Sequence, residues 1–452
     1  MPPPELTVSQ WADQNRRLSP EASSEPGRWV TDRAPYQRGM MDAVNEPGVS
    51  EVVYMTSSQI GKTEILNNII GYFSHQDPSP MLMIQPTLDM AETWSKDRLA
   101  PMIRDTDALT DLFGDPRSRD SNNTLLHKKF PGGHITMAGA NSPASLASRP
   151  IRIVLLDEED RYPHSAGTEG DPGSLAQKRT TTFWNRLLVT ASTPTIEDES
   201  KIESRYQQSD QRKFYVPCPE CDAFQVLSWQ LVKFEKGKPE TTHYECEHCK
   251  ARLKESDKMW MLSHGEWRTE AAFNGIVGFH ISELYSPWVK WSEMVESFFK
   301  AKRLPETLKV WVNTSLGETW KDKTEGVDPS GLLGRKENWG RVAPEGVIVI
   351  TAGVDVQDDR LEAEVIGWGV GQESWSLQYH VLHGDPAQSK VWEDLDNVLT
   401  QTVKTGDGRI LPVACACVDS GGHQTQRVYE YCKAREYQRI YAIKGASQIG
   451  KP

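Results

Sequence analysis

Gly61, Lys62 and Thr63 stand between an apolar run at 52–55 and a helical pattern of apolar residues over 65–70. The order strand, loop, helix is therefore predicted. A loop that leads into a helix N-terminus offers free backbone N–H groups and the positive end of the helix dipole to an anion. In G-x-x-x-x-G-K-[ST] loops the lysine also reaches the β- and γ-phosphates, and the hydroxyl binds Mg²⁺. The stretch predicts a phosphate site, and its alternative is a strand-to-helix turn with a glycine cap.

The loop departs from the usual pattern at Thr56, which occupies the place of the first glycine. No basic residue lies within 57–60. We therefore expect the contact between loop and phosphate to differ first at Thr56. The residues of this stretch predicted to contact a nucleotide are Ser57, Ser58, Gln59, Gly61, Lys62 and Thr63.

Asp157 and Glu158 are adjacent carboxylates at the end of a second apolar run, Ile153 to Leu156. Four consecutive apolar residues are typical of a strand that is buried on both faces. In an ATPase the first carboxylate holds the water shell of Mg²⁺, and the second accepts a proton from the attacking water. The alternative is a strand that ends in solvated acids, but the earlier phosphate loop favours ATP hydrolysis. The acidic run 157–160 also predicts a nearby cation.

Further residues could serve the same nucleotide. The amide of Gln37, placed before a helical pattern at 40–44, could pair with N6 and N7 of an adenine ring, with helix capping as the alternative. Arg149 could reach the γ-phosphate as an arginine finger, from its own subunit or a neighbouring one. Hydroxyl residues before Pro194 could sense the γ-phosphate and couple hydrolysis to movement, or could form a simple turn: Thr190, Ser192 and Thr193.

Four of the seven cysteines form two C-x-x-C pairs, Cys218 with Cys221 and Cys246 with Cys249. Four thiolates at this spacing suit a tetrahedral Zn²⁺ ion. Short strands are predicted around and between the pairs, so we expect a zinc ribbon over residues 214–255. Such a site is closed and therefore structural, because catalysis by zinc needs an open coordination position.

Asp355 and Asp419 are carboxylates on predicted strands that begin at Val347 and Val413. Three meandering strands, a helix and a returning strand follow one another here, which is the ribonuclease-H-like order. Carboxylates on neighbouring strands can hold two divalent ions that activate water and stabilise the leaving oxygen of a phosphodiester. The two residues in this order predict a nuclease, although either could be an ordinary acidic strand end.

Length and composition limit the whole chain. A chain of 452 residues is too long for one core. We expect a flexible N-terminal arm at 1–28, an ATPase domain at 29–200, a linker or lid region with the zinc ribbon at 201–345, and a nuclease domain at 346–452. The net charge of −12 excludes a protein that coats nucleic acid, so DNA contact should be local. Without a signal peptide or a run of roughly 18 apolar residues, a cytosolic protein that does not contact membranes is predicted.

The predicted fold is α/β. A P-loop ATPase of the additional-strand, helicase-like type, with a sheet rich in parallel strands, carries a zinc-ribbon insert and precedes a ribonuclease-H-like domain. From about residue 28 to its end, the chain resembles the large subunit of tailed-phage terminases of the lambda type. The segments that carry the resemblance are Ser57–Thr63, Gly139–Pro150, Leu155–Pro163, Cys218–Cys221, Gly353–Arg360 and Val418–His423.

This resemblance implies an ATP-driven motor that cuts concatemeric viral DNA and pumps it through a portal into an empty capsid. The implied cofactors are ATP with Mg²⁺, Mg²⁺ or Mn²⁺ at the nuclease, and structural Zn²⁺. The implied partners are double-stranded viral DNA, a terminase small subunit, the portal of the procapsid and further copies of the chain in a ring. The implied location is the host cytoplasm.

The resemblance also assigns roles to residues named above. They are Lys62, Thr63 and Asp157 with phosphate and its metal, Glu158 as catalytic base, Arg149 as finger, Thr190 to Thr193 as coupling motif, and Asp355 and Asp419 as nuclease metal ligands. The family's nuclease carries a third acidic residue further along. We expect that residue beyond Pro452, and therefore an incomplete and weak or inactive nuclease in this chain.

Two other functions compete with a packaging motor. One is a cellular helicase-nuclease of DNA repair or restriction, and the other is a zinc-ribbon scaffold with a degenerate nucleotide site. A helicase should carry a second α/β lobe with further motifs after the first. Here a zinc ribbon and a nuclease fold follow instead, which favours the packaging motor.

Overall fold

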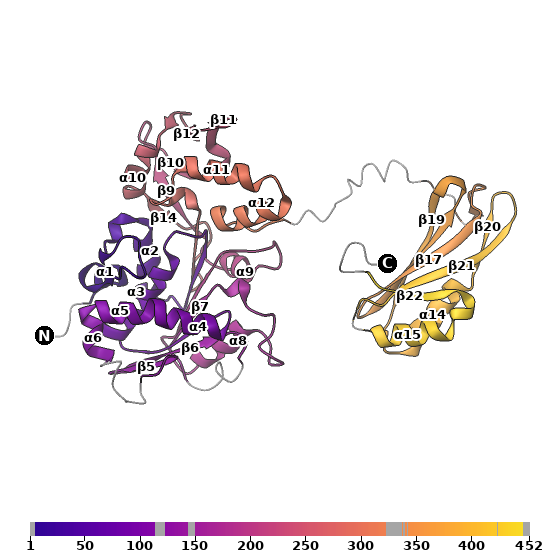
Figure 1. Ribbon diagram of the computed structural model, residues 1–452, viewed down its shortest axis with the longest axis horizontal. Coiled ribbons are helices and arrows are strands. Elements are labelled where there is room, and N and C mark those ends of the chain that lie inside the picture. The colour runs from indigo at the N-terminus through magenta and orange to yellow at the C-terminus, as the bar shows by residue number, and fades with distance from the viewer. Residues whose placement is uncertain are drawn as a thin grey trace. The chain divides into compact units, whose positions relative to one another are not determined.

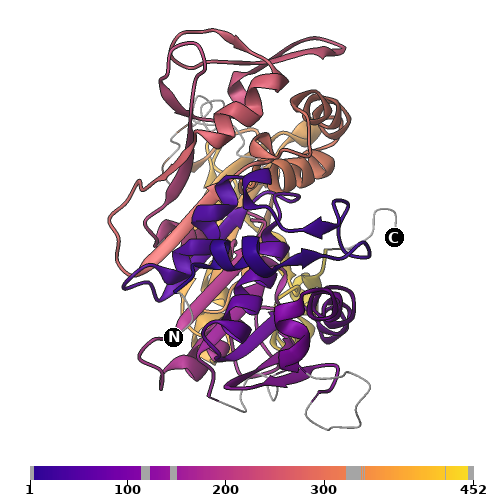
Figure 2. The same ribbon diagram turned by 90° about the vertical axis from the view of Figure 1, so that its left-hand side faces the viewer.

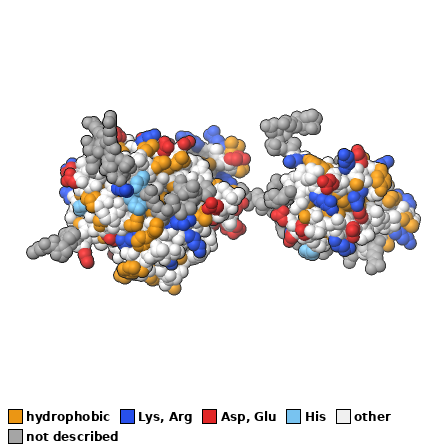
Figure 3. Space-filling model, turned by 90° about the horizontal axis from the view of Figure 1, so that it is seen from below, with side chains coloured by type: hydrophobic (Ala, Val, Ile, Leu, Met, Phe, Trp, Pro, Cys, Tyr) orange, Lys and Arg blue, Asp and Glu red, His pale blue; other side chains and the backbone are white. Residues whose placement is uncertain are grey.

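The chain folds into two compact units, Met1–Thr324 and Glu325–Pro452, each with its own hydrophobic core (Figure 1). No described helix is long and apolar enough to cross a membrane. On the face seen in Figure 3, basic and acidic side chains are interspersed among the described residues. The computed structural model describes residues 5–113, 123–142, 150–321, 337, 340, 342–422 and 424–445.

A large mixed sheet forms the centre of the first unit (Figure 1). Its central strands are parallel and follow the order β15-β3-β8-β7-β4-β6. Alternate residues of these strands enter hydrophobic clusters on opposite faces, which explains their continuous apolar runs. The bounds are β3 Glu51–Thr56, β4 Pro80–Gln85, β6 Gly133–Gly139, β7 Ile153–Asp157, β8 Leu187–Ser192 and β15 Ile276–Ile281.

β8 lies between β3 and β7, so the ends of three parallel strands meet at one edge of the sheet. The phosphate loop follows β3, and the acid pair ends β7. Ligands of open parallel sheets bind at this carboxyl edge. The strand between the two motifs confirms the predicted additional-strand arrangement.

The sheet continues beyond residue 200, where the ATPase domain was predicted to end. β15 pairs with β3 although the zinc-binding cysteines lie between them in sequence. At one edge β9 (Arg212–Pro217) pairs in parallel with β15, and β10 (Phe224–Val226) and β14 (Glu266–Arg268) are antiparallel to β9. At the other edge β5 (His127–Phe130) is antiparallel to β6. Because this pairing joins strands far apart in sequence, the local composition around residue 200 carried no signal of it.

Helices cover the sheet. The predicted helix after the phosphate loop is α3, which buries the apolar positions Ile65, Leu66, Ile69 and Ile70. The other described helices around this sheet are α2 Tyr36–Asp42, α4 Leu88–Trp94, α5 Ala100–Asp105, α6 Asp107–Phe113, α8 Pro172–Gln177 and α9 Lys201–Gln207, and α3 itself spans Lys62–His75.

The described part of the N-terminal segment is folded onto the first unit, in contrast to the flexible arm predicted for 1–28. Its helix α1 (Val8–Asn15) buries Trp11 completely. Trp11 donates from Nε1 to Nδ1 of His75 at 3.1 Å, and its ring lies so close to Gly71 of α3 that a Cβ there would be 2.2 Å away. The short strands β1 (Arg17–Leu18) and β2 (Gly27–Arg28) follow. An amphipathic piece can be recognised in this segment, but its polar surroundings gave no sign that the helix would be buried on the first unit.

The cysteine pairs belong to a small extension at one end of the first unit (top of Figures 1 and 2). Its antiparallel sheet consists of β11 (Val232–Glu235), β12 (Lys238–Glu245) and β13 (Arg252–Leu253). Helices α10 (Glu255–Ser263), α11 (Trp291–Ala301) and α12 (Pro305–Trp311) follow, and the short π-helical turn η8 (Val312–Leu316) continues α12.

The second unit has the strand order β19-β18-β17-β21-β22; β20 also pairs with β21, and β16 pairs with β20. β17, β18 and β19 form an antiparallel meander, whereas β21 and β22 run parallel to β17. This order confirms the predicted ribonuclease-H-like fold. The bounds are β16 Val342–Ala343, β17 Val349–Val356, β18 Arg360–Trp368, β19 Ser374–His383, α14 Ser389–Leu399, β20 Thr402–Thr405, β21 Ile410–Asp419, α15 Thr425–Ala434 and β22 Ile440–Ile443.

The buried N-terminal helix predicts a stability effect. Trp11→Ala removes a fully buried ring and should lower the free energy of unfolding of the first unit by about 3–5 kcal/mol. Trp184→Ala is the matched control, because Trp184 is 95 % exposed and its loss should change that free energy by less than about 0.5 kcal/mol. Urea unfolding followed by circular dichroism measures both. Equal stability of the two variants would contradict the packing of α1.

Candidate functional sites

The phosphate loop lies between the end of β3 and the first turn of α3. Gly61 has a φ of 88°, in the left-handed region that glycine adopts without strain, and Lys62 begins the helix. Gln59 also has a positive φ, of 59°. Thr56, by contrast, is the last residue of β3, is fully buried and keeps strand backbone. The position at which the sequence departs from the usual pattern therefore does not require glycine.

Tyr36 and Gln37 of α2 both contact this loop. Tyr36 Oη donates to the carbonyl oxygen of Ile60 at 3.2 Å, and Gln37 Nε2 donates to it at 2.8 Å. A Cβ on Gly61 would lie 2.3 Å from Gln37 Nε2, so the amide packs directly against the loop. Gln37 therefore lies beside the phosphate loop, as predicted for a nucleotide-binding residue, and its pairing with adenine stays a prediction.

Lys62 and Glu158 form a close ion pair at the carboxyl edge of the sheet. The distance from Nζ to Oε1 is 2.5 Å, and the side chains are only 10 % and 16 % exposed. Arg161 Nε lies 3.5 Å from Glu158 Oε2, and Thr193 Oγ1 donates to that oxygen at 3.3 Å. Burial alone would raise the pKa of Glu158, but Lys62 and Arg161 outweigh burial and hold that pKa below its ordinary value. The structure therefore brings residues of the three predicted motifs into contact.

Asp157 lies beside this pair and is buried. Its Oδ2 accepts from Gln85 Nε2 at 3.0 Å, whereas its Oδ1 has no hydrogen-bond partner among the described residues. Burial raises the pKa of Asp157 above its ordinary value, although Lys62 opposes the effect. A buried carboxylate oxygen without a partner, next to a phosphate loop, fits a divalent cation or one of its waters.

A cavity of about 940 Å³ opens over Lys62 and Glu158, within the usual size range of ligand sites. The N-terminal segment forms part of its wall, a role that the composition of the segment did not predict. Arg149, the predicted finger, lies outside the described residues. Residues that line the cavity and were not among the predicted site residues include Trp29, Arg33, Arg98, Arg161, Trp288 and Thr314.

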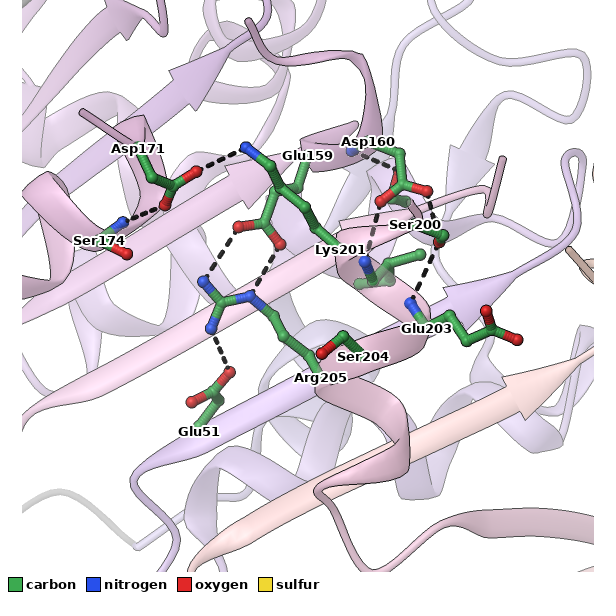
Figure 4. Close-up of polar contacts among 12 residues, drawn as sticks. Glu51, Glu159, Asp160, Asp171, Ser174, Ser200, Lys201, Glu203, Ser204 and Arg205 are labelled. Carbon is green, nitrogen blue, oxygen red and sulfur yellow. Dashed lines mark hydrogen bonds and ion pairs between the residues drawn. The ribbon is translucent and has the colours of Figure 1, made fainter. Parts of the chain in front are cut away.

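Residues of α9 bind the other two carboxylates of the acidic run, Glu159 and Asp160 (Figure 4). Arg205 donates to both carboxylate oxygens of Glu159, at 2.8 and 3.0 Å, and to Glu51 Oε1 at 2.8 Å. Asp160 accepts from the backbone N–H of Ile202 at 2.9 Å and so fixes the start of α9. Burial raises the pKa of Glu159, against the attraction of Arg205. The cation that the acidic run required is thus present, and no local pattern pointed to Arg205.

The four predicted zinc ligands converge. Their sulfur atoms all lie within 4.8 Å of one another, with Cys218 Sγ 3.8 Å from Cys249 Sγ and Cys221 Sγ 3.9 Å from Cys246 Sγ. A tetrahedral ion with Zn–S bonds of about 2.3 Å requires sulfur separations of about 3.8 Å. Disulfides are excluded, because an S–S bond is roughly 2 Å long. The donor set therefore fits a tetrahedral metal ion.

Asp355 and Asp419 lie on adjacent parallel strands of the second unit. The register pairs Val354 of β17 with Val418 of β21, so the next residue of each strand is the carboxylate and both point to the same face. Asp355 is exposed and Asp419 is half-buried. Glu362 of β18 stands directly opposite Asp355. This arrangement places the two predicted metal ligands side by side.

The first unit is a P-loop ATPase of the additional-strand class, since β8 separates the strand of the phosphate loop from the strand of the acid pair. The chain belongs to the family of phage terminase large subunits. The family described as phage terminase large subunit gpA, ATPase domain, matches residues 23–267. The terminase large subunit gpA, endonuclease domain, matches residues 276–452. The chain is accordingly an ATPase and an endonuclease of viral DNA packaging.

Two curated relatives match the full chain. The terminase large subunit of Enterobacteria phage P21 is 31% identical over 477 residues, which are 100% of this chain and 74% of that protein. The one of Escherichia phage lambda is 30% identical over 480 residues, with the same coverage. The solved large terminase ATPase domain of Thermus phage P74-26 shares 14% identity at a TM-score of 0.36, over 61% of this chain and 91% of that one. The curated relatives confirm the predicted family and disfavour a cellular helicase-nuclease or a zinc-ribbon scaffold.

Proposed function

We propose that ATP binds in the cavity over Lys62, with its phosphates at the N-terminus of α3, and that Glu158 is the general base. The observation that carries this proposal is the ion pair of 2.5 Å between Lys62 and Glu158. When the phosphates of ATP bind, the ammonium group of Lys62 leaves the Glu158 carboxylate and pairs with a phosphate oxygen instead. The pKa of Glu158 then rises, because the cation that lowered it has turned to another anion, and the carboxylate becomes a better proton acceptor.

Thr63 and Asp157 would hold the Mg²⁺ ion that accompanies ATP, and that ion would neutralise charge on the β- and γ-phosphates. The partnerless Oδ1 of Asp157 supports this assignment. Gln37 remains the proposed adenine contact. Arg149 remains the proposed finger, from the same subunit or from a neighbouring one.

The coupling motif would respond to the γ-phosphate through its hydrogen bond to Glu158. Thr193 donates to the carboxylate of Glu158, and Ser192 Oγ accepts from the backbone N–H of Asp160 at 3.2 Å. Ser192 also donates to Thr193 O at 3.0 Å, whereas Thr190 Oγ1 is buried and has no partner among the described atoms. A change in the partners of Glu158 would therefore alter the end of β8 directly.

The work of the ATPase is translocation of double-stranded viral DNA into a procapsid. In this proposal, identical subunits form a ring at the portal of the procapsid. A terminase small subunit delivers the DNA to them, and the chain acts in the host cytoplasm. A structural Zn²⁺ ion is assigned to the four cysteines, and two Mg²⁺ or Mn²⁺ ions to Asp355 and Asp419. Membership of the family supports these assignments as a group.

The base assignment predicts a kinetic result. Glu158→Gln keeps the size of the side chain but removes the proton acceptor, so kcat for ATP hydrolysis should fall at least about 100-fold. Binding of a non-hydrolysable ATP analogue should stay within about threefold, because the phosphate contacts remain. Glu240→Gln, at an exposed position of β12, is the control. Normal turnover in Glu158→Gln would refute the assignment.

The cysteine cluster predicts one tightly bound zinc ion per chain. Cys221→Ser removes one thiolate and should abolish stoichiometric zinc and lower the melting temperature. Cys415→Ser, on β21 of the second unit, should keep both unchanged. Elemental analysis by mass spectrometry of the purified variants provides the measurement. Full zinc content in the Cys221 variant would exclude this donor set.

The nuclease assignment predicts loss of metal binding. Asp419→Asn should weaken Mn²⁺ binding to the second unit at least about tenfold and abolish any metal-dependent nicking of plasmid DNA. Asp394→Asn, on α14 at the opposite side of the sheet core, controls for the loss of one charge. Calorimetric titration of the full chain measures the affinity. Unchanged Mn²⁺ affinity in Asp419→Asn would rule out the site.

A further inference from the structure

Residues 313–321, called here the bridging segment, contact two separate parts of the ATPase site. The segment begins in η8 and contains the last described residues before 337. In sequence it leads toward the second unit. It lies far along the chain from the phosphate loop and from the residues that follow the coupling motif, yet it makes hydrogen bonds with both.

The first contact is with the phosphate loop. Thr314 O accepts from the backbone N–H of Ser58 at 2.7 Å and from Ser58 Oγ at 3.0 Å. Gly317, with a φ of 66°, packs on the loop so closely that a Cβ would lie 2.6 Å from Ser57 N. No side chain fits there, since the neighbouring atoms belong to the backbone.

The half-buried His280 holds Gly317 in this position. His280 of β15 lies 3.0 Å from the carbonyl oxygen of Gly317 through its Nε2 atom. Because a carbonyl only accepts, Nε2 carries the proton in this contact. Burial lowers the pKa of His280 to about 4, so the ring is neutral near pH 7 and the contact persists.

The second contact is with the chain that follows the coupling motif. Asn313 Nδ2 donates to Pro194 O and to Thr195 O, each at 2.6 Å. Trp320 N donates to Thr195 O at 2.8 Å, and Glu197 N donates to Trp320 O at 3.0 Å. Two side-chain contacts reinforce this bridge, Lys321 with Glu197 at 2.9 Å and Thr319 with Glu203 at 2.8 Å.

The geometry points to Asn313 and Gly317 as positioning residues of the ATPase, which hold the phosphate loop and the coupling motif at a fixed separation. The inference rests on the function proposed above. Thr193, which donates to Glu158, immediately precedes Pro194, whose carbonyl Asn313 holds. A change at Glu158 is therefore passed to the bridging segment within two residues, and from there to the chain that leads toward the nuclease.

Hydrogen exchange of the wild-type chain, resolved to single amides, tests this coupling without any substitution. Binding of Mg²⁺ and a non-hydrolysable ATP analogue should change the exchange rates of the Ser58, Glu197 and Trp320 amides at least about threefold. A change at Ser58 alone would overturn the inference and leave the proposed ATP site standing. No change at any of the three amides would overturn the proposed ATP site itself.

Two variants separate positioning from simple stability. Asn313→Asp removes both N–H donors and should lower kcat for ATP hydrolysis about tenfold, with KM for ATP within about threefold. The exchange change at Ser58 should persist in it, and the change at Trp320 should be lost. Gly317→Ala, whose Cβ would clash with Ser57 N, should lower kcat similarly.

Asn274→Asp is the matched control, because the amide of Asn274 donates to Gln208 O at 2.9 Å away from the bridging segment. It should leave kcat and all three exchange changes as in the wild type. A lower melting temperature with normal kcat in both Asn313→Asp and Gly317→Ala would show a merely structural role and refute the inference.

Discussion

The buried pair of opposite charges on Lys62 and Glu158 is the interaction on which the ATPase site depends. Neither charge could remain at its depth alone, because an unpaired buried ion is strongly destabilising. The sheet order brings them together. Lys62 lies just after the loop that follows β3, Glu158 directly follows β7, and only β8 lies between these two strands. In the absence of nucleotide the pair satisfies itself. A ligand that separates this pair must offer Lys62 another anion, which agrees with the proposal that Lys62 binds a phosphate.

The acids beside this pair show how neighbouring carboxylates of one run acquire different roles. Asp157 ends a strand, is buried and keeps one oxygen without a partner, so it suits a cation. Glu158 adopts a left-handed backbone, with φ 57°, which turns its side chain toward Lys62. Glu159 points to the other side, where Arg205 neutralises it, and Asp160 accepts from the backbone N–H of Ile202 in the first turn of α9. Arg205 and Asp160 thereby fix the backbone directly after Glu158, the proposed base, and this limits the orientations that its side chain can take.

Most of the chemistry was predictable from sequence because its signals are local. A glycine and lysine after a strand, an acid pair after another and two C-x-x-C pairs each carry their meaning within a few residues. The contacts that escaped prediction are long-range. Arg205 reaches Glu51 across 154 positions of sequence, and Trp11 reaches His75 across 64. The expectation that the loop would differ first at Thr56 failed for another reason. A glycine is needed there only if φ is positive, and φ cannot be deduced from the residue type alone.

The two proposed catalytic sites differ in exposure, and the difference suits the sizes of a nucleotide and of a DNA duplex. A nucleotide can be enclosed by a cavity of about 940 Å³, and burial there strengthens every charge interaction with its phosphates. A DNA duplex cannot be enclosed in this way. In the second unit, α14 and α15 pack on the face of the sheet that holds Val354 and Val418. Asp355 and Asp419, one residue further along, point to the other face, where a duplex can approach. The alternation of side chains along a strand therefore separates the packed core from the proposed metal ligands by one residue, and a shift of register by one position would bury both carboxylates.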